Sequence, residues 1–144
     1  MHGRSTPIPA DPAFRADVLA GLAAPIPAVP ARWLYDRRGS ELFERITALP
    51  EYYPTRTETA LLEAHCGEVA HIAGTGGAVV EFGSGSSAKT PILLEAIEPS
   101  AYVPIDISGG FLRASAAALQ QRFPNLEICP VEADFMGPIR LPDA

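Results

Sequence analysis

The sequence has few cysteines, no long apolar run and no excess of basic residues. Its two cysteines, Cys66 and Cys129, occur without a recognisable secretory leader, so we expect neither a disulfide framework nor export. No segment reaches the roughly 20 consecutive apolar residues that a membrane span needs. The formal net charge of -6 leaves no positive surplus to neutralise phosphates. We therefore expect a cytoplasmic protein that binds neither membranes nor nucleic acid.

The sequence also lacks a recognisable metal site or nucleophile. His65 falls in the apolar stripe of a predicted helix and His71 lies six positions further on, a poor spacing for joint metal ligation with Cys66. No serine, histidine and acid are arranged to suggest a catalytic triad. We predict no metal and no catalytic residue, and we interpret three arginines as surface or salt-bridge residues: Arg37, Arg38 and Arg56.

What the chain does contain is a helical first part followed by an alternating second part. Residues 1–10 hold two prolines among small polar residues and predict a flexible lead-in. Residues 11–74 predict an N-terminal helical segment, and residues 75–144 predict a segment of alternating strands and helices. The glycines that begin at Gly74 mark the boundary between these two parts.

Three helices are predicted in the first part. Asp11 is placed to cap the first helix, and Ser40 precedes the apolar stripe of the second. Thr55 and Glu58 stand three apart, the spacing of a capping box, and predict the start of the third helix. Gly74 is predicted to end that helix.

Strands and helices alternate in the second part. Short apolar runs predict strands over residues 78–82, 102–107 and 126–131, and helical spacing predicts helices through residues 92–97 and 111–123. This β-α-β-α-β order predicts an α/β, Rossmann-like fold with a parallel sheet and right-handed crossovers. A ligand is expected at the carboxyl ends of the strands.

Pro104 conflicts with this pattern. It lies in the middle of the second predicted strand, where it removes a donor from the hydrogen-bond ladder. Proline in that position predicts an edge strand or a bulge.

The turn after the first strand has the composition of a ligand-binding loop. Gly83 and Gly85 let the backbone approach a ligand closely, and the following helix start offers free amides to a carboxylate or phosphate. Glu81 precedes the glycines, where its carboxylate could reach a ligand's ammonium group. A plain tight turn is the alternative interpretation.

Acids follow the other two strands at the same edge of the sheet. Asp106 ends the second strand, where a carboxylate can accept both hydroxyls of a ribose. Asp134 and Phe135 follow the third strand, where the acid could accept from the exocyclic amine of adenine while the ring packs on the base. The alternatives are a solvated helix cap for Asp106 and a loop acid beside a core phenylalanine for the other two.

Two classes of nucleotide ligand use these parts. Gly83, Gly85 and Ala88 also satisfy the dinucleotide fingerprint Gly-x-Gly-x-x-Gly/Ala, with an acid roughly 20 residues further on. Two features favour S-adenosylmethionine over NAD(P): the position of Glu81, and the three helices that precede the first strand. The fingerprint alone does not choose between them.

Three longer stretches go beyond these local signals: YDRRGSELF at residues 35–43 with ITALPEYYPTRTE at 46–58, EFGSGSSAKT at 81–90 and YVPIDIS at 102–108. In these stretches the chain resembles the histidine-specific α-N-methyltransferases of ergothioneine biosynthesis. The resemblance implies a class I methyltransferase fold with S-adenosyl-L-methionine as cofactor and L-histidine as substrate. Three successive methyl transfers would give trimethylhistidine (hercynine).

The resemblance also implies roles for single residues. Tyr52 matches a tyrosine that contacts the histidine substrate, and Tyr35 is a weaker candidate at the same site. The departures, Phe82 for a common leucine and Ser86 for a threonine, leave the chemistry unchanged. The positions that match cofactor contacts are Gly83, Lys89, Asp106, Asp134 and Phe135.

The family is expected to continue beyond Ala144 with further strands and an inserted substrate domain, so the chain matches its N-terminal portion. The resemblance therefore implies that residues 75–144 are the first half of a Rossmann-like domain that binds S-adenosylmethionine. We therefore expect a missing C-terminal half, or a second chain, to complete the substrate site. Two alternatives remain: a non-catalytic module that binds S-adenosylmethionine, and an NAD(P)-binding oxidoreductase domain. A sheet of only three strands leaves edges uncovered, so we expect the isolated chain to be marginally stable.

Overall fold

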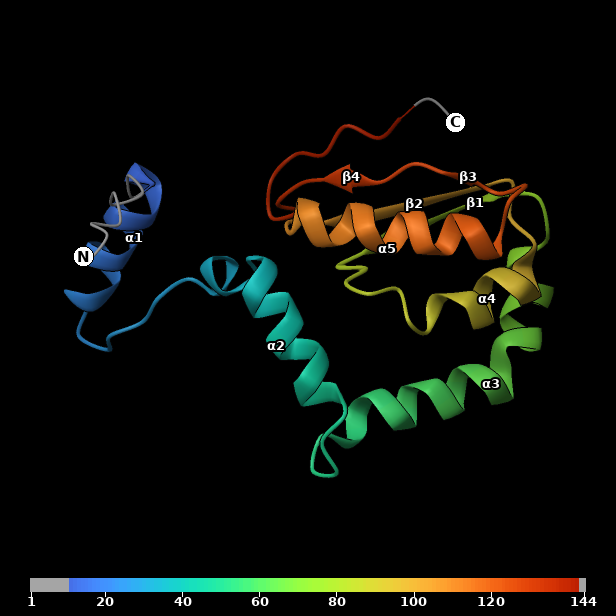
Figure 1. Cartoon of the computed structure of the whole chain (residues 1–144), viewed down its shortest axis with the longest axis horizontal. Helices are drawn as coiled ribbons and strands as arrows, with labels where there is room; N and C mark the ends of the chain where they lie inside the picture. The colour runs from blue at the N-terminus through green and yellow to red at the C-terminus, as the bar shows by residue number, and fades with distance from the viewer. Residues whose placement is uncertain (1–10, 143–144) are drawn as a thin grey trace, which may run out of the picture. The chain divides into compact units, whose positions relative to one another are not determined.

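The structure of the chain, a computed structural model, describes residues 11–142 (Figure 1). The predicted lead-in, residues 1–10, lies outside the described residues. The chain forms two compact units, one up to Leu34 and the other from Tyr35 onward. The boundary predicted at Gly74 falls inside the second unit, and the division of the chain there stays a prediction.

The first unit is built around one helix and a short 3-10 turn. Helix α1 (Pro12–Leu22) is capped by Asp11, as predicted, whose carboxylate accepts from backbone N–H groups of the first turn. The 3-10 turn η1 (Ala31–Leu34) returns to this helix. The indole N–H of Trp33 donates to Asp17 Oδ2 at 2.8 Å and thereby joins the turn to α1.

The second unit opens on helix α2 (Arg37–Thr47), which begins earlier than predicted. Its N-cap is Asp36, whose Oδ1 accepts from the Gly39 N–H at 2.7 Å. Ser40 lies inside the helix and its hydroxyl donates to the Asp36 carbonyl at 3.0 Å. The predicted Ser40 cap is therefore wrong, because a carboxylate stands four residues earlier and caps the helix first.

Helix α3 (Tyr53–Ala73) also begins before its predicted cap. Thr55 lies within the first turn, so the capping-box interpretation is wrong, and Tyr52 occupies the N-cap position without a side-chain bond. Pro54 in the first turn supplies the fixed φ that a helix start requires. The end of the helix is confirmed, since Gly74 is its C-cap.

The sheet is parallel, with order β1-β2-β3 and with β4 also paired to β2. Strands β1 (Ala78–Phe82) and β2 (Ala101–Asp106) pair along their length. The third predicted strand is present as two short strands, β3 (Glu127–Ile128) and β4 (Val131–Glu132), both parallel to β2.

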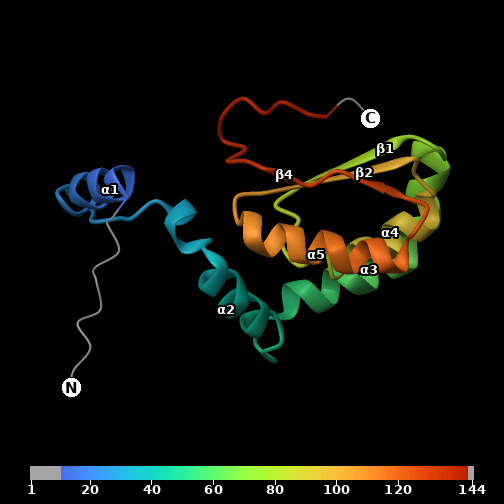
Figure 2. The ribbon, with the colours of Figure 1, turned by 45° about the horizontal axis from the view of Figure 1, so that its top comes forward.

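Two helices connect the strands and cover one face of the sheet. Helix α4 (Thr90–Ile97) joins β1 to β2, and α5 (Gly109–Arg122) joins β2 to β3. Both lie on the same side of the sheet (Figures 1 and 2). Successive right-handed crossovers in one direction require this arrangement. The α/β, Rossmann-like fold is confirmed.

Pro104 explains why the third strand is split. The prediction that the strand containing Pro104 is an edge strand or carries a bulge is wrong. That strand, β2, is central, with neighbours on both sides, and Pro104 itself is buried. The backbone carbonyl of Tyr102 accepts from the Cys129 N–H, so the backbone N–H and C=O groups of even-numbered β2 residues point toward the third strand. The missing N–H of Pro104 falls on that side, between β3 and β4. The register does not shift, since Ala101 lies opposite Glu127 and Ile105 opposite Val131.

The core lies between the sheet and its covering helices. Its buried cluster joins Leu94 of α4, Tyr102 of β2, Leu119 of α5 and Leu126. On the other face of β1, Val80 is 38% exposed and the Phe82 ring 59%. Among residues 11–142, no helix is both long and apolar enough to span a bilayer.

Candidate functional site

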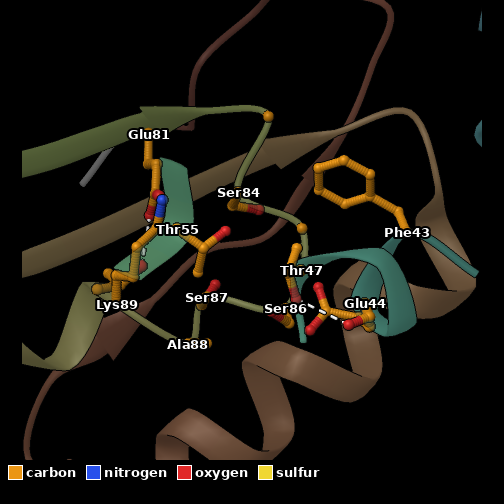
Figure 3. A pocket seen from close by; sticks show the side chains of 13 residues that line it. Phe43, Glu44, Thr47, Thr55, Glu81, Ser84, Ser86, Ser87, Ala88 and Lys89 are labelled. Carbon is orange, nitrogen blue, oxygen red and sulfur yellow. Dashed lines mark hydrogen bonds between the residues drawn. The ribbon is translucent and has the colours of Figure 1, made fainter. Parts of the chain in front are cut away.

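A cavity of about 150 Å³ lies where β1 ends and α4 begins (Figure 3). Glu81 and Lys89 stand at one end of it in this view, and Phe43 and Glu44 of α2 at the other. Two predicted residues of the glycine loop, Gly83 and Gly85, also line it. The remaining lining residues come from α2, α3, the loop and α4: Thr47, Thr55, Ser84, Ser86, Ser87, Ala88 and Thr90.

The glycine loop takes the backbone conformation that its composition predicts. Gly83 and Gly85 have φ of 68° and 53°, a region that other residues enter only with strain. The N–H groups of Gly83 and Ser84 both donate to the Ile105 carbonyl, at 2.8 and 3.2 Å. The loop therefore turns at the end of β1 and is fastened to the end of β2.

Asp106 fixes the other side of this loop. Its Oδ2 accepts from the Gly85 N–H at 3.0 Å, and its Oδ1 accepts from the Ser108 N–H at 2.8 Å. A carboxylate has about four acceptor sites, so these two bonds leave capacity for ligand hydroxyls. The half-buried carboxylate thus lies at the end of β2, as predicted, and holds the loop, while ribose binding stays a prediction.

Glu81 is held from below by two hydroxyl groups. Tyr102 donates to Glu81 Oε2 at 2.5 Å, and Thr90 donates to the same oxygen at 2.8 Å. Burial raises the pKa of the Tyr102 phenol well above its ordinary value, and the bond to Glu81 raises it further, so the phenol stays protonated and remains a donor. Within the described chain no group bonds to Oε1 of Glu81.

Lys89 is paired with a residue of α3. Its ammonium forms an ion pair with Glu58 Oε2, and its side chain is 31% exposed. Lys89 occupies the N-cap position of α4, beside the free amides of that helix. The pair places the Lys89 ammonium at the rim of the cavity and connects α3 to the glycine loop.

Asp134 and Phe135 reach the same loop from the third strand. The Phe135 ring meets Phe82 edge-on, with centroids 5.8 Å apart, and a Cβ placed on Gly83 would lie 3.8 Å from the Phe135 ring. Asp134 is half-buried and its Oδ1 accepts from the Met136 N–H at 3.0 Å. Neither residue lines the cavity, so they extend the site beyond it along the strand ends.

The predicted substrate residues lie apart from the cavity. Tyr52 is half-buried and its ring meets Phe43 edge-on, with centroids 5.9 Å apart. Phe43 lines the cavity and Tyr52 does not. Tyr35 is 47% exposed and is also absent from the lining.

Arg56 holds the corner between α2 and α3 that presents Tyr52. Its guanidinium donates to the carbonyls of Leu49 at 2.9 Å and Pro50 at 2.5 Å, and more weakly to that of Tyr52 at 3.4 Å. The interpretation of Arg56 as a surface residue is therefore incomplete: it is exposed, but its bonds organise the backbone of this corner.

Ser84 carries a buried hydroxyl without a partner. The residue is 6% exposed. Among the polar side-chain atoms of residues 11–142, its Oγ is the one that is buried without a hydrogen-bond partner. Such atoms cost free energy unless a ligand or water completes them. Ser87 nearby has a positive φ of 52°, so backbone strain and an unpaired polar atom coincide in one loop. These features fit a site built to hold a polar ligand.

Replacing Ser84 with alanine is expected to raise the free energy of unfolding of the ligand-free chain by up to about 1 kcal/mol, because a buried unpaired hydroxyl disappears. Urea unfolding would measure the change. Ser86→Ala, in the same loop but half-buried, serves as the control and should change stability by less than about 0.5 kcal/mol. A marked loss of stability in Ser84→Ala would contradict this assignment.

Several residues of the site were missed by sequence reasoning. Helix α2 was interpreted only as an amphipathic helix, and nothing local indicates that Phe43 and Thr47 reach the glycine loop. For Tyr102 a signal existed. It pairs with Val79 on β1, and residues two apart on a strand share a face, so Tyr102 and Glu81 had to point to the same side.

Comparison with known proteins agrees with this geometry. The model of the family described as histidine-specific, SAM-dependent methyltransferase matches residues 14–143. Two relatives named histidine N-alpha-methyltransferase, from Mycolicibacterium smegmatis and Mycobacterium tuberculosis, are each 44% identical over 127 residues. In both cases the match covers 85% of this chain and 39% of the relative.

A further relative is the ergothioneine biosynthesis protein 1 of Neurospora crassa, 40% identical over 84 residues, which are 56% of this chain and 10% of that protein. The chain thus spans about two fifths of the length of the histidine N-alpha-methyltransferases that it matches. The family match favours S-adenosylmethionine over a nicotinamide dinucleotide. The chain belongs to the family of histidine-specific, S-adenosylmethionine-dependent methyltransferases.

Proposed function

We propose that this chain supplies the cofactor-binding half of a cytoplasmic enzyme that methylates the α-amino group of L-histidine. Three successive transfers would give trimethylhistidine (hercynine) in ergothioneine biosynthesis. The observation that carries the proposal is the 44% identity to two histidine N-alpha-methyltransferases over 85% of the chain, a match that spans the cavity and its glycine loop.

Seven residues are proposed to hold S-adenosylmethionine. Gly85 and Gly83 would bring the loop backbone against the ligand, and the unpaired Ser84 hydroxyl supports a polar ligand at that place. Glu81 would bind the ammonium group of the ligand, and Lys89 would bind the ligand's carboxylate. Asp106 would bind the ribose, and Asp134 and Phe135 would bind the adenine.

Methyl transfer places specific demands on these residues. When bound, S-adenosylmethionine supplies a methyl group activated by the adjacent sulfonium. The protein has to hold that methyl in line with a neutral amine, so most of the acceleration would come from proximity and orientation. Asp106, which fixes Gly85 at 3.0 Å, would keep the loop in one geometry during this alignment. We assign no catalytic base.

A second candidate is a non-catalytic module that binds S-adenosylmethionine and carries no substrate site of its own. The observation that favours it is the position of Tyr35 and Tyr52, neither of which lines the cavity. In that case the chain would bind the cofactor without methylating histidine.

Calorimetric titration of the chain with S-adenosylhomocysteine tests the proposal, with NAD as the competing ligand. We expect binding of S-adenosylhomocysteine and none of NAD. Incubation with S-adenosylmethionine and L-histidine, followed by mass spectrometry, separates the two candidates when it is run with the chain alone and with the added C-terminal part of a histidine N-alpha-methyltransferase. Trimethylhistidine in either mixture supports the enzyme, and cofactor binding without methylated product in both supports the module. Absence of S-adenosylhomocysteine binding would contradict both.

A further inference from the structure

The hydroxyl groups on the core side of Glu81 form a connected hydrogen-bond network that no ligand assignment accounts for. Ser87 Oγ lies 3.2 Å from the Tyr102 hydroxyl, which donates to Glu81 Oε2, and Thr90 donates to the same oxygen. The four residues come from the loop, from β2, from β1 and from α4. Tyr102 and Thr90 both donate to one oxygen of the Glu81 carboxylate, and Ser87 is connected to it through Tyr102.

The residues that supply these hydroxyl groups are buried on the core side of the site. Tyr102 has no exposed surface, and Thr90 and Ser87 are 5% and 6% exposed. The Tyr102 ring packs in the hydrophobic cluster with Leu94, so its hydroxyl extends from the core toward the floor of the cavity. The phenol is anchored by its ring, and its oxygen therefore has little freedom to move.

The arrangement leaves one oxygen of Glu81 for the cavity. Both donors bind Oε2, and Glu81 lines the cavity, where none of residues 11–142 bonds to its Oε1. Because two donors fix Oε2, the whole carboxylate is held in one orientation, and the position of Oε1 is set with it. Hydrogen bonds to a charged acceptor are among the stronger bonds in proteins.

We propose that Tyr102, with Thr90, is a positioning residue that holds the Glu81 carboxylate so that its Oε1 receives the ammonium of the ligand's amino-acid part. This inference rests on the proposed cofactor function. Its specific consequence is selectivity within the ligand: the Tyr102 hydroxyl should affect binding of the amino-acid part and leave binding of the adenosine part unchanged.

Two ligands separate these parts. S-adenosylhomocysteine carries the ammonium, and 5′-methylthioadenosine carries the same nucleoside and thioether without the amino-acid part. Tyr102→Phe keeps the ring in the core and removes the hydroxyl. By calorimetry we expect it to weaken S-adenosylhomocysteine about tenfold and to change the affinity for 5′-methylthioadenosine less than twofold.

Three further variants make the assignment specific. Thr90→Val, which removes the other donor, should reproduce the selective loss. In a Glu81→Gln background, Tyr102→Phe should cause no additional selective loss, because the carboxylate through which it acts is gone. Tyr53→Phe, a matched change at a side chain that is 67% exposed, should alter neither affinity.

The outcomes distinguish the inference from the function on which it rests. If the unsubstituted chain binds neither ligand, the proposed function fails and the inference falls with it. If it binds both but Tyr102→Phe weakens them equally, the hydroxyl supports the loop in general and the inference is overturned. No change for either ligand, with thermal melting showing a folded variant, overturns it as well.

Discussion

Replacing Asp106 with alanine is expected to weaken binding of S-adenosylhomocysteine by at least about 100-fold, as measured by calorimetric titration. The substitution removes the acceptor for the Gly85 and Ser108 N–H groups, and it removes the carboxylate proposed to bind the ribose. Hydrogen bonds to a charged group contribute about 1.5–3 kcal/mol each. Loss of the ribose contact alone would account for about tenfold, and release of the glycine loop adds to it.

The matched control is Glu63→Ala, which removes an exposed carboxylate from α3 and should leave the affinity unchanged. Asp106→Asn provides a graded test, because its amide oxygen can still accept one of the two backbone bonds while the charge is lost. We expect an affinity between those of the alanine variant and the unsubstituted chain. An Asp106→Ala chain that binds as tightly as the unsubstituted one would refute the ribose assignment.

Replacing Leu94 with alanine is expected to lower the free energy of unfolding by about 2–5 kcal/mol. Leu94 is 2% exposed and packs on Tyr102, Leu119 and Leu126, so truncation loses buried apolar area and leaves a cavity among large neighbours. Our expectation of marginal stability sharpens this prediction. A typical domain has only about 5–15 kcal/mol in total, so the variant should be partly unfolded near 37 °C.

Leu61→Ala is the control for this prediction, because it makes the same change in a helix at a side chain that is 55% exposed. It should lower stability by less than about 1 kcal/mol. Urea unfolding followed by circular dichroism would measure both variants. Equal losses in the two would show that the cluster around Tyr102 is not the core of the folded chain.

Much of the fold could be predicted because its signals are local. The apolar run before Gly83 and the helical spacing after Lys89 each depend on a few neighbouring residues, and their alternation leaves few topologies for a parallel sheet. The proposed ligand residues could be predicted from the sequence for the same reason. Once the strands are placed, Asp106 and Asp134 must lie at the carboxyl edge.

The errors came from competition between signals. Ser40 is a good cap in isolation, but Asp36 lies one turn earlier and satisfies the helix start first. Thr55 stands three before Glu58 as a capping box requires, yet Pro54 starts the helix ahead of it. In each case two adequate starts compete, and the earlier one extends the helix by about one turn.

Long-range proximity could not be predicted from the sequence. The arrival of Phe43 and Thr47 at the glycine loop depends on how α2 and α3 pack on the sheet, and it leaves no trace in local composition. The Lys89–Glu58 ion pair is of the same kind, since its partners lie on different elements and only tertiary packing brings them together.

The gap opposite Pro104 makes the two edges of β2 chemically different. One edge offers an unbroken row of donors and acceptors to β1, and the other lacks a donor at one position, where the third strand changes from β3 to β4. A strand order in which β1 and the third strand exchanged places would set the long, continuous partner against the defective edge and lose a hydrogen bond. One imino acid thus discriminates between two topologies that the hydrophobic pattern alone would leave nearly equal in energy.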